Sequence, residues 1–435
     1  MESPMTYDVI IIGGGPAGMT AAISAYKKLN HKNAKILLIE KNKKLGKKLY
    51  ATGNGKCNLG NTLLDLTCYE SNQEFFPYEI IDVHTHKLIC DFMDSLGVNI
   101  TNKEGYLYPS SLQASSVVWA MTDKIKEIGV EVHINEECIK TISDKNVYHV
   151  TTDKNTYTSR NLILAPGGAS APKLGGTQKI YSMASQLGLT VYPPYPALCK
   201  LKTATDISML AGVRSKAKAT LYVNDNEYLT ERGELQFTEN SLSGIMIFNL
   251  SCNAGNLIEQ GNKLHILISL LPEQKETEIF EFLVKARESC PTRTIHAILN
   301  GLIHEKLAKY IINIQANGSH TENKNIENDK SDNDLKKNNN PCYRTINTFT
   351  DKELENLAHT IKYLKFEVTG CGSFDEAQVT SGGVDTTCIN PASCEVYGNK
   401  GLFVVGEYLD VTGKCGGYNI MWAIATGMKA GEGVR

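Results

Sequence analysis

Three glycines near the start of the chain have the spacing of a phosphate-binding turn. Gly13, Gly15 and Gly18 form G-x-G-x-x-G between an apolar run at 8–12 and a helix-compatible stretch at 16–29. In such a turn the first glycine permits a sharp bend, the second lets a pyrophosphate approach the backbone, and the third lets helix and strand pack closely. The helix N-terminus then offers free N–H groups and a positive dipole end to the phosphates. Because purely structural glycine turns are common, the pattern needs a second observation.

Glu40 supplies that observation. It ends a second apolar run, 35–39, about 20 residues after Gly18, which is where a carboxylate accepts hydrogen bonds from a ribose 2′-hydroxyl. The alternative is a solvated glutamate at the end of a strand. With strand, glycines, helix and acid in register, the sequence favours a dinucleotide that carries an unphosphorylated ribose, either FAD or NAD.

Two further segments favour FAD. After 41–48 comes a glycine-rich polar loop, Thr52 to Asn58, where a simple NAD dehydrogenase would continue into another βαβ crossover. Such a loop suits close backbone approach to a large planar cofactor. Near the C-terminus, a strand ends in Gly406 and Glu407, with Asp410, Gly413, Gly416 and Gly417 before a helix that starts near Tyr418. This tail can place a carboxylate at ribityl hydroxyls and a helix N-terminus at the carbonyl-bearing edge of the flavin, where the dipole stabilises the anionic reduced form.

No side chain stands out as a strong catalyst. Cys57 is a weak candidate, and we favour a packing role for it because no neighbouring histidine or second cysteine activates the thiol. Tyr418 is the other weak candidate, as a proton donor, although tyrosine at a helix start more often packs. A flavin disulfide reductase would need a cysteine such as Cys415 within disulfide reach of Cys57. None of the 12 cysteines forms a Cys-x-x-Cys pair, so we expect no metal site.

Composition limits the setting of the protein. A chain of 435 residues predicts two or three domains. Its 45 basic and 47 acidic residues give a net charge of −2 with no basic stripe, so we expect no nucleic-acid partner. Scattered cysteines and the lack of a signal peptide predict reduced thiols and a cytoplasmic location. No apolar run reaches the ~18 residues of a membrane helix, so we expect a soluble protein. The oligomeric state is left open.

The elements that must position these residues follow from periodicity. The segment 8–39 reads as a βαβ unit, and a helix at 113–128 with strands at 130–134 and 161–165 extends the same α/β domain. From about residue 191 the runs 197–203, 217–223, 245–250 and 264–270 predict antiparallel β-structure, and 273–289 and 294–315 predict helices. The polar stretch 317–340 predicts a disordered loop. Strands at 377–380 and 402–405 and a final helix at 418–431 complete the prediction.

Together these motifs resemble one family. They resemble the bacterial NAD(P)/FAD-dependent oxidoreductases described as aminoacetone-oxidase-like or bile-acid-reductase-like flavoproteins, over nearly the whole chain except 317–340. The residues that carry the resemblance are Gly13–Gly18, Gly46–Lys48, Thr52–Asn58, Phe237-Thr238, Leu242–Gly244, Val368–Gly370, Glu376-Ala377, Val379–Val384, Gly406–Asp410 and Gly416–Asn419. One departure is Thr177–Ile180, where the family usually has Thr-Gly-Asp-Gly, which puts family contacts there in doubt.

The resemblance implies an α/β fold: a Rossmann-like FAD-binding domain interrupted by a β-rich, barrel-like module and a helical module. We place the FAD domain at 1–190 and 366–435, the β-rich insert at 191–272 and 345–365, the helical module at 273–316 and a flexible loop at 317–344. The flavin contacts implied are Gly13, Gly15, Ala17, Gly18, Glu40, Lys41, Lys48, Thr52, Gly53, Asn54, Gly55, Cys57, Asn58, Cys138, Gly167, Gly168, Gly406, Glu407, Asp410, Gly416, Gly417, Asn419 and Ile420.

The expected activity is that of an FAD-dependent oxidoreductase. We expect NADH or NADPH to reduce FAD and the flavin to pass hydride to a small organic substrate, such as one with an activated C=C bond, under a lid formed by the insert. The nicotinamide cofactor is expected to bind transiently, since Gly167-Gly168 and Gly175-Gly176 lack the spacing of a second fingerprint. Bile-acid or steroid-like enones and amines are substrates suggested by the resemblance alone. The alternative is a flavin-dependent redox sensor or binding protein without significant turnover.

Overall fold

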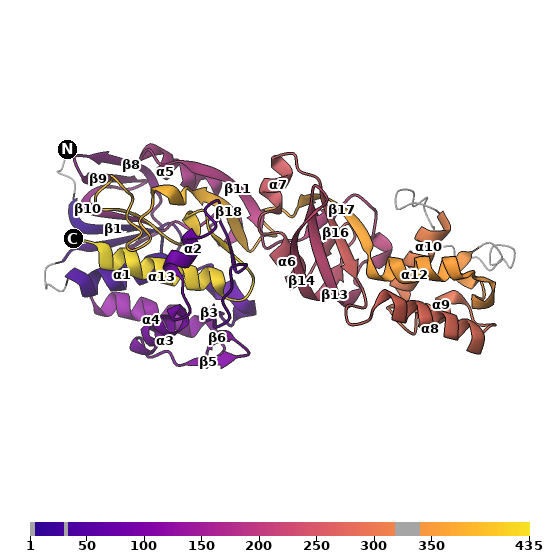
Figure 1. Ribbon diagram of the computed structural model, residues 1–435. Coiled ribbons are helices and arrows are strands. Elements are labelled where there is room, and N and C mark those ends of the chain that lie inside the picture. Colours follow the sequence, from indigo (N-terminus) through magenta and orange to yellow (C-terminus); the bar gives the residue numbers. More distant parts are fainter. Residues whose placement is uncertain (1–4, 30–33, 318–339) are drawn as a thin grey trace. The chain divides into compact units, whose positions relative to one another are not determined.

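The structure of the chain, a computed structural model, describes residues 5–29, 34–317 and 340–435 (Figure 1). It divides into two compact units, Met1–Leu198 with Ser373–Arg435, and Cys199–Gly372. We call them the Rossmann unit and the barrel unit and describe each by itself. The predicted domain boundaries at 191 and 366 differ from these, because the strand that ends at Ala197 pairs within the Rossmann unit and the strand that ends at Cys371 pairs within the barrel unit. The predicted loop at 317–344 lies mostly outside the described residues.

The Rossmann unit is built on a seven-stranded sheet in the order β7-β2-β1-β10-β9-β8, with β19 also pairing with β10. The strands are β1 (Met5–Ile12), β2 (Ile36–Glu40), β7 (Glu131–Ile134), β8 (Cys138–Asp144), β9 (Val147–Thr152), β10 (Thr156–Leu164) and β19 (Leu402–Val404). β7, β2, β1, β10 and β19 are parallel. β2, β19 and the second halves of β1 and β10 are mostly apolar because both of their faces are buried, whereas the edge strand β7 is partly exposed. Ligands of such sheets bind at the carboxyl ends of the strands.

Helices from the two ends of the chain pack together on this sheet. The unit contains α1 (Pro16–Leu29), α2 (Phe76–Ile80), α3 (Thr85–Ser95), α4 (Ala114–Glu127), α5 (Tyr181–Gln186) and α13 (Tyr418–Gly433). α13 lies along α1 in Figure 1, and glycines make the approach possible. A Cβ at Gly427 would lie 2.4 Å from the Ala17 carbonyl oxygen, and one at Gly431 would lie 2.5 Å from the Ser24 Cβ. The final helix is therefore fixed directly against the helix of the glycine turn.

Short strands connect the loops of the Rossmann unit. β3 (Gly60–Asn61), β6 (Tyr106–Pro109) and β5 (Ile100–Lys103) form one small sheet, β4 (Tyr69–Glu70) pairs with β20 (Thr412–Gly413), and β11 (Val191–Ala197) pairs with β18 (Val379–Val384). The β4–β20 and β11–β18 pairs each join a segment from the first half of the chain to the C-terminal segment. They hold the tail in place next to the loops that follow β2 and β10.

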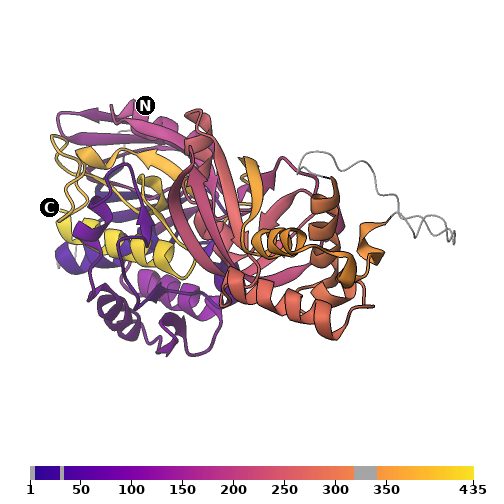
Figure 2. The same ribbon diagram turned by 45° about the vertical axis from the view of Figure 1, so that its right-hand side comes forward.

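The barrel unit contains a closed antiparallel barrel, seen from two directions in Figures 1 and 2. Its strands run in the order β12 (Leu201–Thr203), β15 (Ser241–Ser243), β14 (Asn226–Phe237), β13 (Arg214–Val223), β16 (Leu264–Ser269) and β17 (Leu364–Cys371). Along β13, Ala217, Ala219 and Leu221 are buried while Lys216 is exposed, the alternation expected of a strand with one face in a core. The predicted β-rich insert is confirmed as a barrel.

Helices complete the core of the barrel unit. They are α6 (Ile245–Leu250), α7 (Ala254–Glu259), α8 (Glu276–Ser289), α9 (Ile295–Leu299), α10 (Glu305–Asn317) and α12 (Asp351–Lys362). Phe366 on β17 lies 6.2 Å, between ring centroids, from both Phe237 of β14 and Tyr310 of α10. Barrel and helices therefore share one hydrophobic core. Across the described ranges, no helix is both long and apolar enough to cross a membrane.

Two element predictions in this unit were wrong. The segment 245–250 is the helix α6 and not a strand: Gly244 turns the chain at φ +105°, and Met246, Ile247 and Leu250 share a buried helical face. The single helix expected at 294–315 is broken into α9 and α10. The segment 345–365, which was placed in the β-rich insert, contains α12, which begins with a capping box in which Thr350 and Glu353 bond each other's backbone N–H groups.

Candidate functional site

The glycine turn leaves open space at one of its three motif glycines. A Cβ at Gly13, where φ is +107°, would lie 2.1 Å from the Ala165 carbonyl oxygen, and one at Gly18 would lie 1.9 Å from the Gly13 carbonyl oxygen. A Cβ at Gly15 would meet nothing within 4 Å. α1 begins at the next residue, so the N–H groups of its first turn have no partner within the helix. Donors and free space thus coincide where a diphosphate would bind, and the residues fit that group.

Glu40 is held against this turn. Its side chain is buried at the end of β2, with 8% of the residue exposed. Oε2 accepts a hydrogen bond from the Gly14 N–H at 2.8 Å, and Oε1 accepts bonds from the Asn42 backbone N–H at 2.7 Å and side-chain amide at 2.6 Å. Since each carboxylate oxygen has two acceptor positions, Oε2 can still accept from a ribose hydroxyl. Asn42, which the sequence did not single out, orients this carboxylate.

The loop after Glu40 folds back onto the glycine turn. The Gly46 N–H donates to the Gly14 carbonyl oxygen at 2.8 Å. The 3₁₀ segment η1 (Leu49–Gly55) contains Gly53 and Asn54 in the left-handed region, at φ +56° and +53°. The Thr52 hydroxyl donates to the Leu49 carbonyl oxygen at 2.7 Å. The predicted glycine-rich loop is therefore a tight structure beside the turn, stabilised by its own backbone bonds.

The C-terminal tail meets this loop through an ion pair. Lys48 Nζ lies 2.9 Å and 3.1 Å from the two carboxylate oxygens of Glu407, in the short segment η8 (Gly406–Tyr408). The Thr380 N–H donates to the same carboxylate at 3.0 Å. A Cβ at Gly168 would lie 2.6 Å from Glu407 Oε1. Three residues from three separate segments, Lys48, Gly168 and Thr380, therefore surround the Glu407 carboxylate.

The second helix N-terminus lies beside the loop after η1. Gly417 precedes α13 at φ +97°, and a Cβ there would lie 2.6 Å from the Asn58 side-chain oxygen. The Asn61 side-chain amide donates to the Gly416 carbonyl oxygen at 3.2 Å. Asn419 closes the turn by bonding both the N–H and the carbonyl of Gly413, at 2.9 Å and 2.6 Å. The Ile420 N–H bonds the Gly417 carbonyl oxygen at 3.1 Å.

The remaining predicted site residues lie at other places in the Rossmann unit. Tyr418 donates its hydroxyl to the Leu63 carbonyl oxygen at 2.7 Å, and burial raises its pKa. Cys138 begins β8, the outermost strand of the sheet, and burial raises the pKa of its thiol to about 12. At the departure from the family pattern, the Thr177 hydroxyl accepts the Lys179 N–H at 3.4 Å and caps a 3₁₀ turn. Gly167 lies in open space at φ +82°.

Cys57 is expected to be unreactive in the folded protein. Its side chain is fully buried and burial raises the pKa of the thiol to about 12, so very little thiolate exists at neutral pH. We expect iodoacetamide to leave Cys57 unmodified in the native, flavin-reduced protein and to alkylate it after denaturation, as read by peptide mass spectrometry. The partly exposed Cys290 is the positive control for labelling. Rapid native labelling of Cys57 together with a second cysteine would instead support a disulfide reductase.

The Lys48–Glu407 pair is expected to couple more strongly than an exposed pair. Its side chains are 31% and 18% exposed, whereas those of Lys352 and Glu355 are 78% and 51% exposed. Double-mutant cycles with Lys48→Met and Glu407→Gln, measured by urea unfolding of the FAD-free protein, should give a coupling energy of about 1–2 kcal/mol. The Lys352–Glu355 cycle should give about 0.3 kcal/mol. Equal couplings would mean that the first pair does not tie the tail to the loop.

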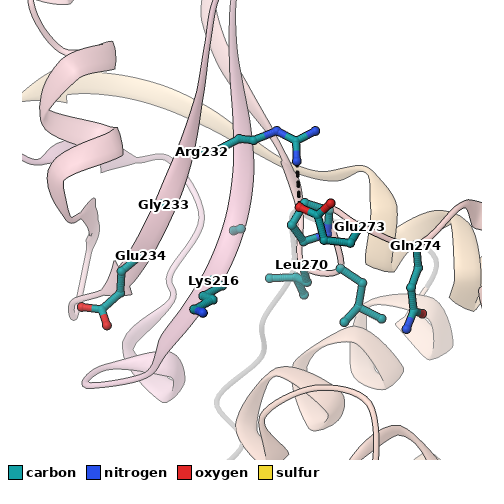
Figure 3. Close-up of a pocket in the computed structure, with 10 residues that line it drawn as sticks. Lys216, Arg232, Gly233, Glu234, Leu270, Glu273 and Gln274 are labelled. Carbon is teal, nitrogen blue, oxygen red and sulfur yellow. Dashed lines mark hydrogen bonds and ion pairs between the residues drawn. The ribbon is translucent and has the colours of Figure 1, made fainter. Parts of the chain in front are cut away.

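A pocket outside this region lies in the barrel unit (Figure 3). It is lined by β13, β14 and the segment after β16, and Arg232 on its rim pairs with Glu273 at 2.8 Å. None of the predicted cofactor residues lines it. Within the ranges that the structure describes, no group of three or more His, Cys, Asp or Glu side chains could hold a metal ion.

Comparisons with known proteins show the family of this chain. The family model described as HI0933-like protein Rossmann domain matches residues 7–433. The chain is 30% identical to the 3-dehydro-bile acid delta(4,6)-reductase of Clostridium scindens, over 97% of both chains. It is 27% identical to the ribosomal RNA dihydrouridine synthase of Haemophilus influenzae, over 95% of both chains.

Solved structures add only a distant likeness. The 3-ketosteroid delta1-dehydrogenase of Sterolibacterium denitrificans aligns over 98% of both chains at 12% identity and a TM-score of 0.45, which supports no inference about activity. The predicted Rossmann-like fold with a barrel insert, the recognised family and the enzyme class are confirmed by the structure and the family match. The chain belongs to the HI0933-like family of FAD-dependent Rossmann oxidoreductases.

Proposed function

We propose that the protein transfers hydride from NADH or NADPH through FAD to an activated C=C bond of a small organic substrate. The observation that carries the proposal is the convergence of two chain ends, 359 residues apart, on one site through Lys48 and Glu407. A bound flavin supplies the hydride chemistry, and the protein supplies binding, orientation and electrostatics. This accounts for the lack of a strong catalytic side chain among the residues that the sequence indicated.

The chain's own residues divide the work of holding FAD. The first turn of α1 and the open position at Gly15 would hold the diphosphate, and Glu40 would bond the ribose. The loop 52–58 and the N-terminus of α13 would border the flavin ring, where the helix dipole favours negative charge. The Lys48–Glu407 pair fastens these two borders together. Backbone contacts near Cys138 and Gly167 complete the proposed set.

The relatives point to two substrates that share one chemistry. The name of the Clostridium scindens relative specifies reduction of a bile acid, and two relatives at 27% and 26% identity are ribosomal RNA dihydrouridine synthases. Dihydrouridine is uridine reduced at a C=C bond conjugated to a carbonyl group, as in an enone. We favour the small molecule because the chain carries a net charge of −2. A ribosomal RNA uridine is the second candidate, supported by those two relatives.

An anaerobic acceptor screen tests the proposal. FAD-loaded protein is mixed with NADH or NADPH until the absorbance of oxidised flavin is lost, and then with one acceptor at a time. We expect a 3-dehydro bile acid with conjugated C=C bonds to reoxidise the flavin with many turnovers. Reoxidation by a ribosomal RNA fragment alone would favour the second candidate. Failure of every acceptor, with flavin bound and reducible, would favour the sensor alternative.

A further inference from the structure

Buried hydroxyl groups without partners gather beside the tail of the Rossmann unit. Tyr181 at the start of α5 and Ser381 on β18 are 7% and 6% exposed, and within the described part of the chain neither hydroxyl has a hydrogen-bond partner. The Tyr181 ring stacks on Tyr408, with 5.3 Å between centroids. β18 runs beside the same tail segment, since the Asp410 N–H donates to the Val384 carbonyl oxygen at 3.0 Å. Buried polar groups of this kind are commonly satisfied by an internal water.

Asp410 is the acidic group of this cluster. It is 6% exposed, and its Oδ2 accepts the Asn72 N–H at 3.0 Å. Burial raises the pKa of its carboxyl to about 6, although hydrogen bonds from Asn72 and the Gly382 N–H act in the opposite direction. An aspartic acid with this pKa is protonated in part of the molecules near neutral pH and can both give and regain a proton.

The surroundings of Asp410 are mostly acidic or neutral. Asp385, just after β18, raises the Asp410 pKa further, and Asp410 in turn raises the pKa values of Tyr181 on α5 and Tyr192 on β11. Glu407 also acts on Tyr181, but its charge is matched by Lys48. The titratable groups that face this cluster are therefore Asp385, Glu407, Tyr181 and Tyr192, and the nearby cation is Lys48.

The cluster borders the residues proposed to hold the flavin. Asp410 lies three residues after Glu407, and Ser381 directly follows Thr380. The Thr380 N–H donates to Glu407, and the Thr380 hydroxyl accepts the N–H groups of Ala169 and Ser170. Reduction of a C=C bond consumes NAD(P)H and one proton: hydride adds to one carbon and the proton to the other. The stoichiometry of the proposed reaction therefore requires one proton at the substrate for each turnover.

We propose that Asp410, linked by an internal water to the hydroxyls of Tyr181 and Ser381, is the proton store for this reduction. The proposal rests on the proposed function. The Asp410 carboxyl releases its proton through the water to the substrate carbon, becomes a carboxylate, and is reprotonated from solvent before the next turnover. Asp410 does not touch the substrate; it holds the proton in position and acts through the water. Tyr181 and Ser381 hold the water that carries it.

An infrared titration tests the store without any turnover. Difference spectra of the FAD-loaded and FAD-free protein between pH 4.5 and 8, about two units around the Asp410 pKa, should show a protonated-carboxyl band that is lost with a midpoint near pH 6. Asp410→Asn should abolish the band, and Asp385→Asn, the neighbouring acid, should keep it with a lower midpoint. Tyr181→Phe should raise the midpoint, because the carboxylate loses a water-mediated donor. A wild-type spectrum without such a band would overturn the proposal.

Stopped-flow kinetics test the use of the proton. Reduced protein is mixed with an acceptor found in the screen, at a series of pH values. The wild-type rate of flavin reoxidation should fall above about pH 6. Below that pH, Asp410→Asn should reoxidise at least about tenfold more slowly than the wild type, and its rate should show no change of slope near pH 6. Flavin reduction by dithionite should be unchanged. If Asp410→Asn shows the wild-type pH profile, the proposed proton store is overturned but the proposed hydride transfer is not. If no acceptor reoxidises the wild-type enzyme, the proposed function is contradicted, and the infrared result still tests the proton store.

Discussion

Glu40→Ala is expected to abolish stable FAD binding. The substitution removes the acceptor for a ribose hydroxyl and also leaves the Gly14 N–H and both Asn42 donors without their partner, so the turn loses its orientation. A hydrogen bond to a charged acceptor contributes about 1.5–3 kcal/mol, so the loss of the ribose bond alone weakens FAD affinity by about one to two orders of magnitude, and the loss of order in the turn weakens it further. Isothermal titration of FAD into the FAD-free protein measures the change directly.

Two matched variants separate the ribose role from a general effect of charge. Glu137→Ala removes an exposed acid in the connection between β7 and β8, and this variant should bind FAD as the wild type does. Glu40→Gln keeps one acceptor oxygen and should lie between the two. Full retention of flavin colour by purified Glu40→Ala would contradict the ribose role of this carboxylate.

The sequence was informative where short-range patterns decide structure. The βαβ unit was predicted with α1 at its observed bounds, because an apolar strand, a glycine turn and helical periodicity follow one another without ambiguity. The segment 245–250 was predicted wrongly, since a short segment with five apolar residues out of six is compatible with either a strand or a buried helix. Gly244, whose Cβ would lie 2.3 Å from the Glu234 carbonyl oxygen, was the local signal for a turn at that point.

The site could be predicted only in part, because only some of its residues belong to short-range patterns. Gly13, Gly15, Gly18 and Glu40 are close in sequence and have a spacing with a known physical purpose. The pairing of Lys48 with Glu407 depends on how α13 packs against α1, which no local pattern specifies. Asp410 was predicted as a cofactor contact from its place in the tail. Its raised pKa comes from burial and from the nearby Asp385, against the hydrogen bonds from Asn72, and therefore depends on the three-dimensional structure.

Gly15→Ala is expected to separate folding from cofactor binding. Gly15 does not require a left-handed backbone, and its added methyl group would meet no protein atom within 4 Å, so the FAD-free protein should be as stable as the wild type or more stable by about 0.5–1 kcal/mol. The same methyl group fills the space through which the diphosphate approaches the first turn of α1. FAD affinity should therefore fall by about 100-fold, equivalent to about 3 kcal/mol.

Gly18→Ala is the matched control, three residues along the same turn. Its Cβ would lie 1.9 Å from the Gly13 carbonyl oxygen, which is backbone and cannot move aside without displacing the turn from β1. We expect a loss of more than about 3 kcal/mol of stability, seen as low soluble yield or a lower thermal midpoint with or without FAD. If Gly15→Ala is instead as unstable as Gly18→Ala, the glycine at 15 serves packing. If Gly15→Ala binds FAD normally, the open space is not where the diphosphate lies, because a methyl group placed there would block it.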